Sequence, residues 1–170
     1  MIDQVEYKII NEPIPEIKAI LKNTIYGTKG LRYSHMDTDE KLHDVSNPDF
    51  HTLWLRNELV AVAAYCKRNI STAGKRYSAY YIRYFSVEPK YQGNGLGKFL
   101  TKKLEEHYRS TVKEPSVFYA YIEKENLKSM GVSDHFHPES LGRFKSILFS
   151  RFRPSFNSKF EQISPIEYET

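Results

Sequence analysis

The chain of 170 residues has a single cysteine, and no apolar run in it approaches the length of a membrane span. One cysteine, Cys66, excludes an internal disulfide and suits a reducing compartment. The first residues, "MIDQVEYKII", lack the architecture of a signal peptide. We therefore expect a cytoplasmic protein that does not associate with membranes.

The sequence also lacks a basic arm, repeats and low-complexity segments. Its net charge of +4 and pI of about 9.0 permit an anionic ligand, but the basic residues are dispersed. A dispersed distribution argues against nucleic acid as a partner. The length predicts one domain, which we place at residues 1–153 and follow with a C-terminal tail at 154–170.

Metal-ligand spacing is missing as well. The "DHFH" stretch places His135 and His137 two residues apart, and the other histidines show no complementary spacing. Because a zinc site needs three or four ligands, we expect no metal.

Hydrophobic periodicity predicts alternating strands and helices. Strands are expected at 5–10, 51–56, 58–68, 78–87, 116–122 and 142–154, and helices at 15–26, 38–45, 96–108 and 123–132. Residues 69–75 are expected to form a loop, the strand at 116–122 to be covered on both faces, and Ile25 to lie on the buried face of its helix. This order predicts an α/β (α+β mixed) fold with one mixed, mostly antiparallel sheet and helices on both faces.

The sequence also lacks acidic residues at the expected start of one helix. From Gln92 to Lys103 there is no carboxylate, although a helix is expected to begin there. The first amides of a helix have no internal partner, and the helix dipole places partial positive charge at that end. Glycines at 93, 95 and 97 leave those amides uncovered, and Lys98 adds positive charge. The segment predicts an anion site, most simply for phosphate; a glycine-rich turn capped by water is the alternative.

Spacing separates the kinds of phosphate loop. A P-loop requires a glycine where Gln92 stands and Ser or Thr where Phe99 stands. The Rossmann fingerprint, counted from Gly93, places Lys98 at its last glycine position. Neither pattern fits, which disfavours a nucleotide-binding domain.

The pattern that fits is Q-x-x-G-x-G, formed by Gln92, Gly95 and Gly97, after a strand that ends "FSVEP". It resembles the coenzyme A loop of the GNAT superfamily of N-acyltransferases, and Val87 and Pro89 match the strand end that precedes the loop in that family. The resemblance implies a GNAT-like fold and an acetyl-CoA-dependent N-acetyltransferase that acts on a small-molecule or peptide amine by direct transfer. A non-catalytic acyl-CoA-binding module is the alternative, and a homodimer is left open.

The same resemblance implies the cofactor-binding residues. Phe85, Ser86 and Val87 would line the pantetheine arm. The pyrophosphate would be held by the loop residues Gln92, Gly93, Asn94, Gly95, Leu96, Gly97 and Lys98. Asn126, with Ser129 three residues later, stands where relatives contact the cofactor arm, although Asn is also a favoured helix cap.

The catalytic residues depart from the family pattern. Many relatives carry a tyrosine that protonates the leaving thiolate, and Ser133 stands at that position here. Tyr121 is the substitute that we expect to act as the acid, and Glu123 is a candidate base at a strand end. Arg83 on a central strand is expected to pair with a carboxylate such as Glu58 or Glu123, or to meet an acidic acceptor group. Cys66 is expected to be a packed thiol.

Overall fold

The structure is a computed structural model that describes residues 2–26, 42, 48–140 and 142. Five strands run through it: β1 (Val5–Ile10), β2 (Pro48–Leu55), β3 (Glu58–Thr72), β4 (Lys75–Val87) and β5 (Ser116–Ala120). The helices are α1 (Pro15–Asn23), α3 (Leu96–Thr111) and α4 (Leu127–Ser133), with short 3₁₀ turns η1 (Ile2–Gln4), η2 (Pro89–Tyr91) and η3 (Asp134–Phe136).

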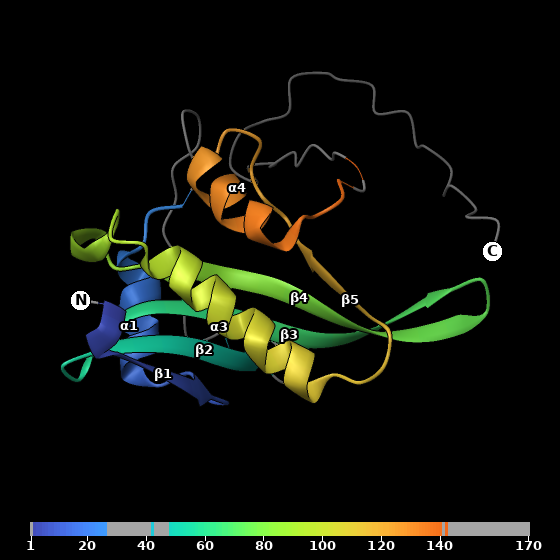
Figure 1. The fold of residues 1–170 in the computed structure, drawn as a ribbon, viewed down its shortest axis with the longest axis horizontal. Coiled ribbons are helices and arrows are strands. Elements are labelled where there is room, and N and C mark those ends of the chain that lie inside the picture. The colour runs from blue at the N-terminus through green and yellow to red at the C-terminus, as the bar shows by residue number, and fades with distance from the viewer. Residues whose placement is uncertain (1, 27–41, 43–47, 141, 143–170) are drawn as a thin grey trace, which may run out of the picture. The chain divides into compact units, whose positions relative to one another are not determined.

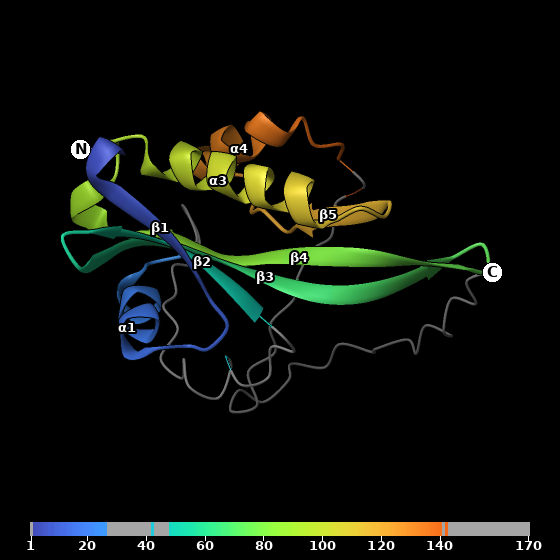
Figure 2. The ribbon, with the colours of Figure 1, turned by 60° about the horizontal axis from the view of Figure 1, so that its bottom comes forward.

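The strands form one mixed sheet in the order β1-β2-β3-β4-β5. The first three pairings are antiparallel, and β4 pairs with β5 in parallel. Helix α1 covers one face of the sheet, and α3 and α4 lie on the other (Figures 1 and 2). The predicted mixed sheet with helices on both faces is therefore confirmed.

Two tight turns build the antiparallel part of the sheet. Arg56 and Asn57 join β2 to β3 with φ values of 50° and 65°, and Ala73 and Gly74 join β3 to β4 with φ values of 47° and 71°. Positive φ at both central residues is the signature of the type I′ turn, whose twist matches that of the flanking strands.

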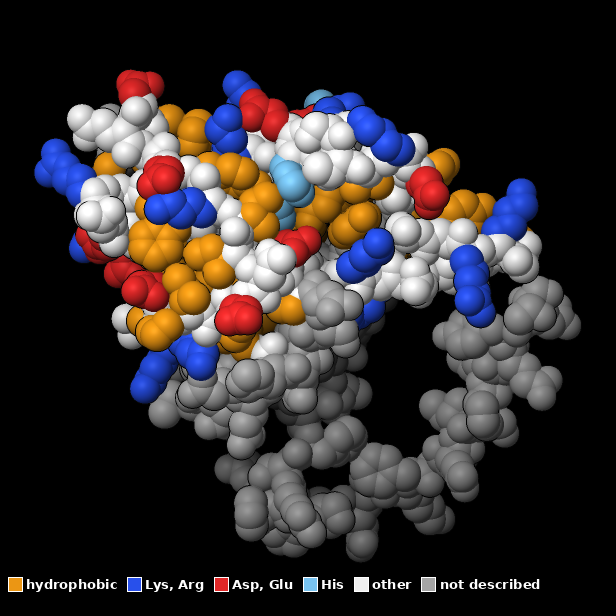
Figure 3. Space-filling view, turned by 90° about the horizontal axis from the view of Figure 1, so that it is seen from below, with side chains coloured by type: hydrophobic (Ala, Val, Ile, Leu, Met, Phe, Trp, Pro, Cys, Tyr) orange, Lys and Arg blue, Asp and Glu red, His pale blue; other side chains and the backbone are white. Residues whose placement is uncertain are grey.

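The expected loop at residues 69–75 is wrong. Strand β3 continues to Thr72, which pairs with Lys75, and Ile70 pairs with Tyr77 farther along the ladder. This part of the hairpin projects beyond the rest of the sheet, and Figure 3 shows Lys and Arg side chains at the projecting end. Within the described part of the chain, residues 69–75 belong to neither buried core, and their sequence shows no apolar alternation that would predict a strand.

The two faces of the sheet bury separate cores. On the α1 face, Ile17, Ile20 and Leu21 pack against side chains of the sheet such as Phe50 and Val62. Pro15 at the first helical position and a 3.6-residue apolar period explain why this segment forms a helix. The helix ends at Asn23, so Ile25 lies beyond it and is 67% exposed, which corrects the expectation that Ile25 is buried.

On the α3 face the predicted apolar stripe is confirmed. Leu96, Leu100, Leu104 and Tyr108 are buried, and Phe99 is half-buried. By contrast, Val117 and Phe118 of β5 are 36% and 43% exposed, so the expectation that this strand is covered on both faces is wrong. Among the described strands β5 pairs only with β4, and a strand with one neighbour is covered less than a central one.

A histidine is buried in the α3-side core. His51 is fully buried, with its Nδ1 2.5 Å from the hydroxyl of Tyr7 and its Nε2 3.2 Å from the hydroxyl of Tyr108. Burial, helped by the nearby His107, lowers the pKa of His51 to about 3. The ring is therefore neutral in the folded protein at physiological pH.

Some predictions lie outside the described residues. These are most of the short helix at 38–45, the late strand at 142–154 and the tail at 154–170. The chain divides into two compact units, residues 1–137 and 138–170, and all of the elements above belong to the first. The domain boundary at residue 153 stays a prediction.

Candidate functional site

The parallel strands β4 and β5 separate before β4 ends. Their last pair is Ile82 with Ala120, and β4 continues to Val87 without β5 beside it. The edge of β4 from residue 83 to 87 therefore offers backbone groups that the β4–β5 ladder does not use. In Figure 1 the chain leaves β5 at this point and rises to α4.

A bulge lies in β4 at the same place. Val62 pairs with Ser86 and Ala64 with Arg83, so two residues of β4, Tyr84 and Phe85, oppose one residue of β3. Tyr84 has a φ of 52°, a conformation that costs a residue with a β-carbon about 1–3 kcal/mol. Such bulges are common beside active sites, where they redirect the strand and leave a residue out of the ladder.

The three strand residues predicted to line the pantetheine arm lie in or beside this bulge. Phe85 and Val87 are half-buried against the α3-side core. Ser86 is buried, and its hydroxyl lies 2.8 Å from the hydroxyl of Tyr26. Because these side chains are largely packed, the part of the segment that remains available to a ligand is its backbone.

The predicted anion loop connects β4 to α3. Gly93 and Gly95 have φ values of 81° and 78°, which explains the glycines at these positions. The side chain of Gln92 donates to the carbonyl of Val87 at 3.1 Å, and the side chain of Asn94 donates to the carbonyl of Tyr91 at 3.1 Å. Both polar side chains thus fix the loop from within.

Helix α3 begins without a capping side chain. Gly95 is its N-cap, and the first turn contains no acidic residue. The amides of Leu96, Gly97 and Lys98 are therefore the uncapped N–H groups of the helix, and the Lys98 side chain beside them is exposed. This geometry fits a phosphate or pyrophosphate group.

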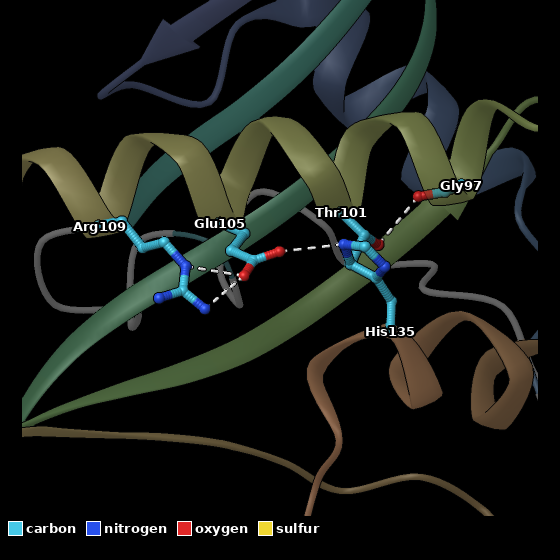
Figure 4. A network of polar contacts seen from close by, with 5 residues as sticks. All are labelled: Gly97, Thr101, Glu105, Arg109 and His135. Atoms are coloured by element: carbon cyan, nitrogen blue, oxygen red, sulfur yellow. Dashed lines mark hydrogen bonds and ion pairs between the residues drawn. The ribbon is translucent and has the colours of Figure 1, made fainter.

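Helix α4 packs beside the start of α3. A β-carbon built on Gly97 would lie 3.3 Å from Cγ2 of Val132 in α4 and 3.6 Å from Cε1 of Phe85 in β4. Farther along, the Glu105 carboxylate of α3 accepts two bonds from Arg109 and lies 3.0 Å from Nε2 of His135 in η3 (Figure 4). The bond from Arg109 holds the pKa of Glu105 below its usual value.

Asn126 is the N-cap of α4, and its side-chain oxygen accepts a bond of 3.1 Å from the amide of Ser129. The capping role that the sequence allowed is therefore confirmed. A contact between Asn126 and a cofactor stays a prediction. Lys128 in the same helix reaches the side chain of Gln92 at 3.4 Å, which ties α4 to the loop.

The three catalytic candidates lie in different surroundings. Tyr121 is 62% exposed, and its ring meets the ring of Tyr81 edge-on with centroids 5.4 Å apart. The hydroxyl of Ser133 donates to the carbonyl of Met130 at 2.7 Å, so its proton is already engaged. Glu123 is exposed, and its carbonyl accepts from the amide of Asn126 in the turn before α4.

The surroundings of Arg83 correct one expectation. Glu58 pairs with Lys90 and accepts a bond of 2.9 Å from the hydroxyl of Tyr91, so it is not the partner of Arg83. Instead, the Arg83 guanidinium carbon lies 5.5 Å from the ring centroid of Tyr81 and 4.7 Å from that of Tyr84. Sequence reasoning singled out Arg83 but did not predict the bulge beside it.

A surface hollow of about 530 Å³ lies elsewhere, beside the β2–β3 turn. Its lining residues are Gln4, Leu55, Arg56, Glu58 and Tyr91. None of the predicted site residues lines this hollow. We therefore place the candidate site at the split between β4 and β5 and at the start of α3. Within the described part of the chain no cluster of His, Cys, Asp and Glu could hold a metal ion, and no helix is long and apolar enough to cross a membrane.

The buried thiol is the last candidate group. Cys66 is fully buried in the α1-side core, and burial raises the pKa of its thiol. A protonated thiol without access to solvent is a poor nucleophile. The expectation that Cys66 is a packed core residue is confirmed.

Comparison with known proteins identifies a family that matches this chain. Residues 17–137 match the model of the acetyltransferase (GNAT) family. No curated protein sequence matches the chain significantly.

Among solved structures, a ribosomal-protein-alanine N-acetyltransferase from Brucella melitensis biovar Abortus 2308 is similar with a TM-score of 0.64 and 13% identity, over 86% of this chain and 99% of that chain. A predicted acetyltransferase with acetyl-CoA from Clostridium acetobutylicum has a TM-score of 0.59 and 13% identity, over 85% and 96%. An aminoglycoside acetyltransferase from an uncultured soil metagenomic sample has a TM-score of 0.57 and 14% identity, over 87% and 97%. At these identities the likeness shows the fold alone.

Proposed function

The chain belongs to the acetyltransferase (GNAT) family, and from this premise we propose that it transfers an acetyl group from acetyl-CoA to a primary amine by direct transfer. The main observation behind the proposal is that the β4–β5 split, with its bulge at Tyr84, and the uncapped start of α3 lie next to each other. A β-carbon at Gly97 in α3 would lie 3.6 Å from the ring of Phe85 in β4.

The residues present fit acetyl-CoA. The amides from Leu96 to Lys98 are uncapped, and no acidic residue in the first turn of α3 would repel a pyrophosphate. Gly95 keeps the loop in a conformation that a residue with a side chain rarely adopts. The unpaired edge of β4 from residue 83 to 87 offers peptide groups to the extended pantetheine arm.

When bound, acetyl-CoA supplies a thioester carbonyl open to attack and a thiol leaving group. Backbone N–H groups near Val87 are the donors that we assign to the carbonyl oxygen. The amine nitrogen bonds to the acetyl carbon, the carbon–sulfur bond breaks with its electron pair on sulfur, and the proton lost by nitrogen balances the one gained by the thiolate.

Tyr121 is the group that we assign to protonate the sulfur, because its exposed side chain follows directly after the last β4–β5 pair. Glu123 is assigned to take the proton from the amine, through water. Ser133 is a weaker acid candidate, because its hydroxyl proton is held by the carbonyl of Met130.

The engaged hydroxyl of Ser133 favours an alternative function, a module that binds acyl-CoA without catalysis. A domain that binds acyl-CoA without turnover would need the loop and the split but no acid. Release of CoA from acetyl-CoA in the presence of an amine separates the two functions, since the binding module would release none.

The experiment that tests the donor site is calorimetry with CoA on the wild type, Gly95→Val and Gly74→Val. Both glycines have positive φ, 78° and 71°, so the two substitutions impose similar backbone strain. Only Gly95 lies in the loop, where its new side chain would also meet Cδ1 of Ile2, 3.5 Å from the β-carbon position. We expect at least a tenfold weaker CoA affinity in Gly95→Val and none of that loss in Gly74→Val. Equal affinities in all three proteins would contradict the site.

A further inference from the structure

A set of aromatic rings and one guanidinium lies at the point where β4 and β5 separate. The last pair of the ladder is Ile82 with Ala120. Arg83 is therefore the first residue of β4 beyond the ladder, and Tyr121 is the first residue that follows Ala120. Both side chains approach the ring of Tyr81.

The rings of Tyr81, Tyr119 and Tyr121 form a continuous aromatic surface. Tyr81 and Tyr119 stack with centroids 5.0 Å apart and planes 9° apart. Tyr121 stands edge-on to Tyr81 at 69° and to Tyr119 at 76°, and it is 62% exposed. Aromatic rings attract further rings in stacked and edge-to-face arrangements. This surface can therefore receive an aromatic group from solvent.

The surface belongs to the α1 face of the sheet. Ala64, the cross-strand partner of Arg83, is buried in the α1-side core together with Tyr84, and Tyr81 packs against that core. The uncapped start of α3 lies on the opposite face, where Leu96 is part of the other core. A ligand on these rings would thus reach the split from the side away from the proposed pyrophosphate site.

Arg83 gives this surface a charge. Arg83 is a half-buried residue whose guanidinium lies over the rings of Tyr81 and Tyr84, and among the described residues it forms no ion pair. Arginine presents a rigid fork that binds a carboxylate through two parallel hydrogen bonds. A guanidinium on an aromatic surface is suited to a ligand that carries both a carboxylate and a ring, and it repels a polycationic ligand.

We propose that the acceptor is an α-amino acid with an aromatic side chain, whose carboxylate binds Arg83 and whose ring lies against Tyr81 and Tyr121. This inference rests on the proposed acetyl transfer, which supplies the reaction of the amino group. Arg83 is then the residue that determines specificity, because an amine without a carboxylate loses the paired hydrogen bonds to its fork.

The first experiment compares L-phenylalanine with phenethylamine and L-phenylalanine amide, which keep the ring and the amine and lack the carboxylate. Release of CoA from acetyl-CoA gives kcat/KM for each amine. We expect wild-type kcat/KM to be at least tenfold higher for L-phenylalanine than for either analogue, since charge-assisted hydrogen bonds of this kind discriminate by about 10- to 100-fold.

Two variants identify the source of that preference. Arg83→Gln should lower kcat/KM for L-phenylalanine by about 10- to 100-fold and leave that for phenethylamine nearly unchanged. Arg76→Gln, in the same strand but on the exposed hairpin, is the matched control and should behave as the wild type. An equal loss for all three amines in Arg83→Gln, or a wild type that prefers phenethylamine, would overturn the assignment.

A binding measurement keeps this inference separate from the proposed function. Calorimetry with N-acetyl-L-phenylalanine in the presence of CoA needs no turnover. If no amine releases CoA, the proposed function fails, and binding alone then decides the subsite. Binding to the wild type that weakens at least tenfold in Arg83→Gln supports the subsite, whereas equal binding to both, or no binding, contradicts it.

Discussion

Gly97 in α3 lies directly against Val132 in α4, so closely that a β-carbon at Gly97 would come within 3.3 Å of Cγ2 of Val132. The same β-carbon would lie 3.6 Å from the ring of Phe85 in β4. Three elements that carry predicted cofactor contacts therefore meet at one glycine. Its small size sets how close the start of α3 can come to the other two.

The first prediction follows from this contact. Gly97→Ala should force Val132 to move by a few tenths of an ångström and should weaken CoA binding about three- to tenfold, as measured by calorimetry. Gly131→Ala is the matched control, because Gly131 lies in α4 and a β-carbon there would meet nothing within 4 Å. CoA affinity in Gly131→Ala should equal that of the wild type. A Gly97→Ala protein that binds CoA normally would show that this packing does not control the site.

The second prediction concerns the acid. Tyr121→Phe keeps the ring surface with Tyr81 and removes only the hydroxyl, so kcat should fall while CoA affinity stays the same. General-acid help is worth about 10²–10⁴-fold. The thiol leaving group, with a pKa of about 8.5, needs less help than a more basic leaving group. We therefore expect a loss toward the lower end of that range. A normal kcat in Tyr121→Phe together with a large loss in Ser133→Ala would transfer the role to Ser133.

The third prediction is that no acyl-enzyme forms. Cys66 is fully buried, and burial raises the pKa of its thiol, so it cannot act as the nucleophile. The intact mass of the protein after incubation with acetyl-CoA alone should be unchanged. Cys66→Ala should keep most of the activity and lose only a little stability, about 1 kcal/mol from the small cavity. An acetyl adduct on Cys66 would rule out direct transfer.

The fourth prediction concerns pH and His51. Its folded-state pKa of about 3 lies below the ordinary value of 6.5, so the unfolded chain binds the proton more readily between these two values. The contribution of neutral His51 to the free energy of unfolding is complete above pH 6.5 and is lost as the pH falls toward 3. By pH 5 the loss should reach about 2 kcal/mol, from 1.36 kcal/mol per pH unit.

Urea unfolding at several pH values between 7.5 and 5 measures how steeply the free energy of unfolding changes with pH. His51→Gln should be less stable at pH 7.5, because Tyr7 and Tyr108 lose their partner, but its stability should depend less on pH. His137→Gln, at an exposed position that forms no ion pair among the described residues, is the control and should keep the wild-type slope. Equal slopes in all three proteins would show that His51 is not the titrating group.

Local patterns predicted most of the fold because their physical causes are local. The apolar period from Leu96 to Tyr108 predicts α3, and the missing carboxylates after Gln92 indicate its uncapped start. Asn57 predicts the β2–β3 turn, since asparagine tolerates positive φ. The described elements follow the expected order for the same reason.

The features that escaped prediction depend on tertiary context. Tyr84 adopts a positive φ because two residues of β4 oppose one of β3, and a tyrosine carries no local signal for that conformation. The extension of the β3–β4 hairpin lacks apolar alternation because it projects beyond the core. The stacked rings of Tyr81 in β4 and Tyr119 in β5 come from distant parts of the chain, which the parallel crossover brings together.

The measurement that tests the central claim most directly is mass spectrometry of an amine incubated with acetyl-CoA and the purified full chain. With L-phenylalanine we predict N-acetyl-L-phenylalanine and an equal amount of free CoA, with both amounts reduced in Gly95→Val and unchanged in Gly74→Val. Wild-type protein that binds CoA at the α3 loop but forms no acetylated product from any primary amine would contradict acetyl transfer.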